Sequence, residues 1–71
     1  MMYRIKTATG FTSEANEEAV RTCLVDAIIE RNDDLESRFR EILLGIHELQ
    51  ADLSRDSLTT PNGTLITRIT K

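Results

Sequence analysis

The chain has 71 residues, carries a formal net charge of −3 and contains one cysteine and one histidine. This length allows one domain at most, and a domain of this size buries only about 60% of the surface of its unfolded chain, so its stability is marginal. Cys23 cannot form an intramolecular disulfide, and Cys23 with His47 cannot supply the four ligands of a structural zinc site. We therefore expect self-association or a larger partner to stabilise the fold.

The sequence predicts a single cytoplasmic domain over residues 1–71, with no cofactor. Its first residues lack the apolar core of a signal peptide, and no apolar run is long enough to span a bilayer. Charge is distributed unevenly, because residues 13–36 are strongly acidic whereas both terminal segments are mildly basic.

The first predicted element is a strand at about residues 2–8, where apolar and polar side chains alternate and β-favouring types dominate. Gly10 then interrupts the pattern. A helix is predicted next, at about residues 13–31, with Thr12 or Ser13 as its N-cap and several acids in its first turns.

This first helix has an apolar stripe that we expect to be buried. Cys23 borders the stripe, which favours a buried structural thiol over a nucleophile. The stripe consists of Val20, Leu24, Ala27 and Ile28.

A second helix is predicted at about residues 34–54, with Asp33 or Asp34 as its N-cap. Gly45 lies on its core side and either permits close approach of a neighbouring helix or is simply tolerated, at about 1 kcal/mol of helix propensity. Apolar residues recur at alternating steps of four and three, the spacing of a packed helix seam. The seam consists of Leu35, Phe39, Ile42, Ile46, Leu49 and Leu53.

The C-terminal segment changes to threonine-rich sequence around a Pro61-Asn62-Gly63 turn, which predicts a β-hairpin at about residues 57–70. A two-stranded hairpin is marginal in water, so we expect the first and last strands to pair. The predicted fold is α+β in the order β-α-α-β, an antiparallel helical hairpin with a small antiparallel sheet from the terminal segments.

Each helix also carries a second apolar patch away from its main stripe. Three short strands are too few to cover both patches, so we expect them to form a homodimer interface or to await a partner protein. The predicted self-interface comprises Val25, Ile29, Leu44, His47 and Ala51.

The acidic surface of the first helix suits contact with a basic surface on a target protein. A solvated helix face with acids placed favourably near its N-terminus is the simpler interpretation of the same residues. The predicted partner-binding residues are Glu14, Glu17, Glu18, Asp26 and Glu30.

Nucleic-acid binding is the main alternative function. A strand followed by two helices is also the order in ribbon-helix-helix repressors, but those have short helices after a basic strand, whereas the first helix here is long and acidic. Basic residues of the terminal segments would still support weak phosphate contact if they gather on one sheet. The possible phosphate contacts are Arg4, Lys6, Arg68 and Lys71.

No catalytic or metal-binding motif is present, and a lone helical histidine such as His47 lacks a nucleophile at helical spacing. In size, acidity and lack of catalytic residues, the chain resembles the small accessory proteins of bacteria and phages, including inhibitors that cap a host protein. We therefore predict a non-enzymatic, dimeric regulator or inhibitor that caps a basic surface of a target. A purely structural oligomerisation domain is a further alternative, in which the apolar patches alone decide assembly.

Overall fold

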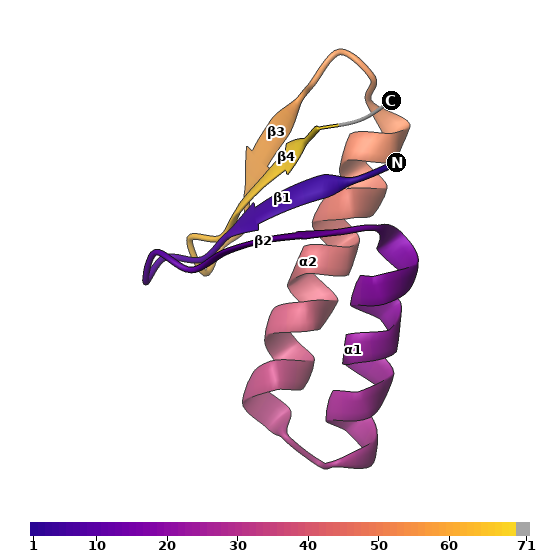
Figure 1. Cartoon of the computed structure of the whole chain (residues 1–71), viewed down its shortest axis with the longest axis vertical. Helices are drawn as coiled ribbons and strands as arrows, with labels where there is room; N and C mark the ends of the chain where they lie inside the picture. The colour runs from indigo at the N-terminus through magenta and orange to yellow at the C-terminus, as the bar shows by residue number, and fades with distance from the viewer. Residues whose placement is uncertain (70–71) are drawn as a thin grey trace.

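The computed structural model describes residues 1–69, in which two antiparallel helices pack on one face of a four-stranded antiparallel sheet (Figure 1). The α+β class and the helical hairpin beside a sheet of terminal segments are therefore confirmed. The elements are β1 (Tyr3–Lys6), β2 (Thr12–Ala15), α1 (Glu17–Ile29), α2 (Asp33–Ala51), β3 (Ser57–Thr59) and β4 (Leu65–Arg68).

The sheet has the strand order β2-β1-β4-β3, so the first and last segments of the chain form its centre. Ile5 of β1 lies opposite Ile66 of β4, and Ile66 lies opposite Leu58 of β3. The predicted pairing of the terminal strands and the predicted hairpin around Pro61-Asn62-Gly63 are both confirmed. Gly63 has a φ of +83°, a backbone conformation that glycine adopts without steric penalty.

Strand β2 was not predicted, and the predicted start of the first helix at residue 13 is wrong. The chain turns back at Gly10, and Thr12 and Ser13 pair with β1 as an edge strand instead of capping a helix. Asn16 is the N-cap of α1, and its side chain accepts a hydrogen bond of 2.8 Å from the amide of Ala19.

The helix ends also differ from the prediction. Asn32 caps α2 by accepting from the amide of Leu35, so neither Asp33 nor Asp34 is the N-cap. Between the helices Arg31 adopts a left-handed conformation, with φ +56°, and the amides of residues 31 and 32 close the last turn of α1. Because α2 ends at Ala51, Leu53 lies beyond the seam and is 74% exposed.

The hydrophobic core lies between α2, the start of α1 and the inner face of the sheet. Most of the predicted seam is buried or half-buried, but on α1 the side chain of Ile28 is 46% exposed and Cys23 is exposed, which corrects the predicted burial of both. The fully or nearly fully buried core residues are Tyr3, Ile5, Val20, Ile42, Ile46, Leu49, Leu58 and Ile66.

Gly45 is the point of closest approach between α2 and the sheet. A Cβ at this position would lie 2.6 Å from Cδ1 of Ile66 and 3.0 Å from Cδ1 of Leu58. The predicted close approach therefore occurs, but the neighbour is the β3–β4 hairpin and not another helix. Because glycine has no side chain, the sheet can pack close against α2 at this position.

Candidate functional site

Glu17 joins the two helices at the first turn of α1. Gln50 donates from Nε2 to its Oε1 at 2.5 Å, and Nε2 of His47 lies 3.2 Å from its Oε2; both partners are on α2. The same carboxylate also pairs with Arg21, one turn further along α1. The hydrogen bonds from Gln50 and then His47, helped by the charge of Arg21, hold the pKa of Glu17 below its ordinary value.

Replacing Glu17 by glutamine is expected to lower the free energy of unfolding near neutral pH, with a difference from wild type that disappears in acid. The pKa of Glu17 is lowered by folding, so its stabilisation is present above the unfolded-state pKa. The stabilisation is lost as the pH falls through the lower folded-state pKa. Urea unfolding followed by circular dichroism from neutral pH down to about pH 3, below the usual range of a glutamate, measures this dependence.

Glu18→Gln is the matched control, because Glu18 shares the first turn of α1 and its helix dipole with Glu17, but its side chain is exposed and bonds to no other described residue. This variant is expected to change the free energy of unfolding much less than Glu17→Gln near neutral pH. A difference between Glu17→Gln and wild type that stays constant down to the lowest pH would contradict the role of the ionised carboxylate.

The contacts of Glu17 also locate the solvent-exposed side of the helical hairpin. Positions Arg21, Val25 and Ile28 follow Glu17 at steps of four, four and three, so they continue its stripe along α1 beside α2. On α2, Leu44 precedes His47 by three residues and continues the stripe that faces Glu17. Two stripes, each containing both apolar and polar side chains, thus run side by side along the solvent side of the hairpin.

We call the four exposed large apolar residues of these helices the outer face. Their side chains remain exposed although the core beneath them is complete, with exposed fractions of 47%, 46%, 73% and 59%. His47 and Ala51, also predicted at a self-interface, lie on the same stripe of α2 and are exposed. The members of the outer face are Val25, Ile28, Ile29 and Leu44.

Two arginines that border the outer face are paired within their own helices. Arg21 pairs with Glu17 on α1, and Arg40 pairs with Glu36 on α2 at 2.9 Å. Both pairs have the acid four residues before the arginine, the favourable orientation on a helix. These two arginines therefore add little uncompensated positive charge to the border of the outer face.

The structure divides the predicted partner-binding acids among several roles. Glu14 lies on β2 and pairs with Arg4 of β1 at 3.4 Å, Glu17 bridges to α2, and Glu30 is the C-cap of α1. Glu18 and Asp26 remain on the exposed surface of α1, where they line a shallow depression beside Val25. Contact of these acids with a basic target stays a prediction.

The basic residues expected on one sheet surface are separated. Arg4 and Lys6 lie on the outer side of β1, but Arg68 lies opposite Tyr3 with its side chain only 6% exposed. Its guanidinium donates to the backbone carbonyl oxygens of Leu49 and Arg55, at the end of α2. Arg68 is therefore unavailable for phosphate contact, and Lys71 lies outside the described residues.

His47 and Cys23 are the two titratable residues considered for chemistry from the sequence. His47 is partnered by a glutamate across the helical hairpin, and Cys23 is an exposed free thiol. Within residues 1–69, no group of three histidine, cysteine or acidic side chains is arranged to hold a metal ion. Neither described helix is both long and apolar enough to cross a membrane.

Comparison with protein-family models gives no match to this chain, and comparisons with curated proteins and with solved structures likewise find no similar protein. Function is therefore inferred from the surface of the chain itself. Its most distinctive feature is the outer face, which the sequence indicated through Val25, Ile29 and Leu44 and to which the structure adds Ile28. The bridging role of Glu17 had no sequence signal, because its partners His47 and Gln50 are 30 and 33 residues away.

Proposed function

We propose that this chain is a non-enzymatic protein-interaction module that works as a homodimer joined through the outer face. The observation that carries the proposal is the exposure of four large apolar side chains over a core that is complete without them. Single exposed apolar residues are normal on any surface, but four large ones on the two helices of one hairpin favour an interaction site.

A second copy of the chain suits this surface for an electrostatic reason. The two arginines that border the outer face, Arg21 and Arg40, are each neutralised by a glutamate of the same helix. These arginines therefore add little repulsion when two identical surfaces meet, while the exposed acids Glu18 and Asp26 lie beside Val25 at the edge of the contact. A two-fold contact of this kind would place four helices around one apolar centre, with a sheet on each outer side.

The small size of the domain supports the same proposal. A chain of 71 residues has few buried side chains, and the two helices and four short strands already use them. Burial of the outer face would add apolar area that a domain of this size lacks on its own.

Leu44→Glu is expected to raise the dissociation constant of the dimer by about 100-fold or more, because the substitution places a carboxylate at the centre of the proposed contact. Light scattering coupled to size exclusion, at micromolar protein concentration, measures the mass of each variant. The wild type is expected at twice the monomer mass of 8.1 kDa, and the variant at the monomer mass.

Phe11→Glu is the matched control, because Phe11 is a large apolar residue with 77% exposure in the β1–β2 turn, outside the outer face. This variant is expected to remain a dimer. A monomeric wild type, or a Leu44→Glu variant that retains the dimer mass, would overturn the proposal. Circular dichroism of each variant shows that the helices are intact.

A further inference from the structure

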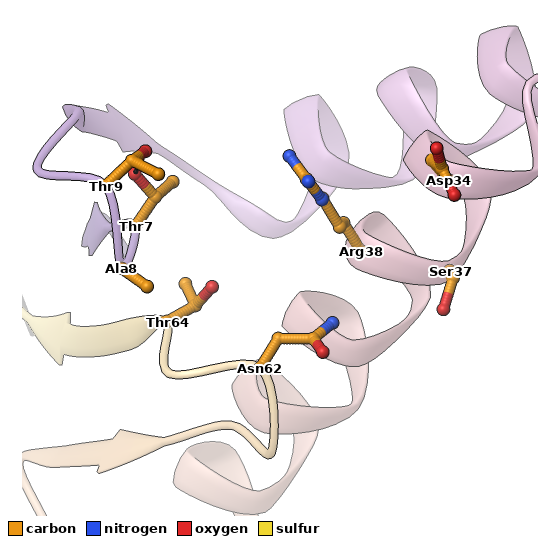
Figure 2. Close-up of a pocket in the computed structure, with 8 residues that line it drawn as sticks. All are labelled: Thr7, Ala8, Thr9, Asp34, Ser37, Arg38, Asn62 and Thr64. Carbon is orange, nitrogen blue, oxygen red and sulfur yellow. Dashed lines mark hydrogen bonds between the residues drawn. The ribbon is translucent and has the colours of Figure 1, made fainter.

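A polar cleft of about 350 Å³ lies where the β1–β2 turn, the β3–β4 turn and the beginning of α2 meet (Figure 2). None of the residues that line it belongs to the outer face, so an inference about the cleft does not depend on the proposed dimer. The lining residues are Thr7, Ala8, Thr9, Asp34, Ser37, Arg38, Asn62 and Thr64.

Arg38 is the cation of this cleft, and its guanidinium forms no ion pair within residues 1–69. Three arginines on the helices have an acid four residues before them, and two of these arrangements form ion pairs: Glu17 with Arg21 and Glu36 with Arg40. The third, Asp34 with Arg38, forms none among the described residues. Figure 2 shows Arg38 extending away from Asp34, toward the turn that carries Thr7 and Thr9.

The β1–β2 turn offers a hydroxyl donor to the cleft. Oγ1 of Thr7 accepts from the amide of Phe11 at 3.1 Å, and its own hydroxyl hydrogen has two acceptors within reach, Oγ1 of Thr9 at 3.0 Å and the carbonyl oxygen of Phe11 at 3.4 Å. When Thr7 donates to Thr9, the shorter of the two contacts, the hydroxyl hydrogen of Thr9 is free to donate to a ligand. In that arrangement the turn presents an additional donor opposite the guanidinium.

The β3–β4 turn forms one wall of the cleft and is hydrogen-bonded to α2. Asn62 donates from Nδ2 to Oε2 of Glu41 at 2.7 Å and from its amide to Oε1 at 3.3 Å. These two bonds attach the turn to α2. Asn62, which lines the cleft, is therefore held in place by Glu41 of α2.

We infer that this cleft binds a small carboxylate, held by the guanidinium of Arg38 and the hydroxyl of Thr9. The planar guanidinium presents paired donors that match the two oxygens of a carboxylate. The carboxylate of Asp34, one turn before Arg38 on α2, disfavours a dianion such as phosphate more strongly than a monoanion. A volume of 350 Å³ suits a ligand of a few heavy atoms up to the size of an amino acid.

Acetate and inorganic phosphate are the probes, titrated separately into ¹⁵N-labelled full-length protein at constant ionic strength set with sodium chloride. Heteronuclear NMR spectra are expected to show saturable acetate shifts at the amides of residues 7–9 and at the side chain of Arg38. Arg38→Gln is expected to raise the dissociation constant for acetate about tenfold or more, as for loss of a charge-assisted pair. Asp34→Asn is expected to lower it several-fold.

Arg55→Gln is the matched control, because Arg55 is an exposed arginine that does not line the cleft. It is expected to bind acetate like the wild type, and the spectrum of each free variant shows that the fold is retained. Non-saturable shifts, unchanged binding in Arg38→Gln, or tighter binding of phosphate than of acetate would overturn the inference.

Discussion

Gly45→Val is expected to lower the free energy of unfolding by about 3 kcal/mol, the upper part of the range for overpacking a core. Even a methyl group at this position would meet Cδ1 of Ile66 at 2.6 Å and Cδ1 of Leu58 at 3.0 Å. Valine adds two further carbons, and Ile66 is fully buried and has little space in which to move. Urea unfolding followed by circular dichroism measures the change.

A double-mutant cycle separates this clash from a general effect of substituting Gly45. Ile66→Val removes the δ-methyl group that a Cβ at position 45 would meet. In the Gly45→Ala background, Ile66→Val is expected to be less destabilising than in the wild type by about 1 kcal/mol, the coupling usual for residues in contact. Additive effects of the two substitutions would contradict close approach of β4 to α2 at this position.

Arg68→Met is expected to lower the free energy of unfolding by about 2 kcal/mol, because it removes two charge-assisted hydrogen bonds from a buried guanidinium. The guanidinium of Arg68 donates to the carbonyl oxygen of Leu49, in the last turn of α2, and to that of Arg55, in the loop after it. A cation at this end of a helix also interacts favourably with the helix dipole. Methionine retains much of the length and apolar stem of the side chain but cannot donate.

Asp56→Asn is the matched control for Arg68. Oδ1 of Asp56 lies 3.6 Å from the guanidinium, but its side chain is 84% exposed, and such a pair contributes little in water. This variant is expected to unfold at nearly the wild-type urea concentration. Equal destabilisation by Asp56→Asn and Arg68→Met would show that the ion pair, and not the carbonyl contacts, carries the stabilisation.

The positions of Arg68 and Arg4 show why the sequence could not predict which side chains of the sheet face solvent. Both residues lie in strands of alternating pattern, and both were predicted to face solvent. The pairing of Arg68 with Tyr3 and of Arg4 with Thr67 places the two arginines on opposite sides of the sheet. That register forms between segments about sixty residues apart, and a shift of β4 by one residue would place Arg68 on the same side of the sheet as Arg4.

Strand β2 and the cleft were missed for a related reason. Thr12 to Ala15 have no apolar alternation, and Ser13 before an acidic run has the local features of a helix cap. Only pairing with β1 makes this segment a strand. The cleft likewise combines two turns and a helix that are distant in the sequence.

The sequence by itself determined the two helices, the turn between them and the C-terminal hairpin, because periodicity, caps and turn residues act between close neighbours. It also determined that Val25, Ile29 and Leu44 lie off the main stripes, where the structure leaves them exposed. Only the tertiary structure decided that Glu17 bridges the helices, that the side chain of Arg68 is buried and that the sheet packs closely against α2 at Gly45. Each of these depends on which distant segments meet, and that depends on the packing of the whole chain.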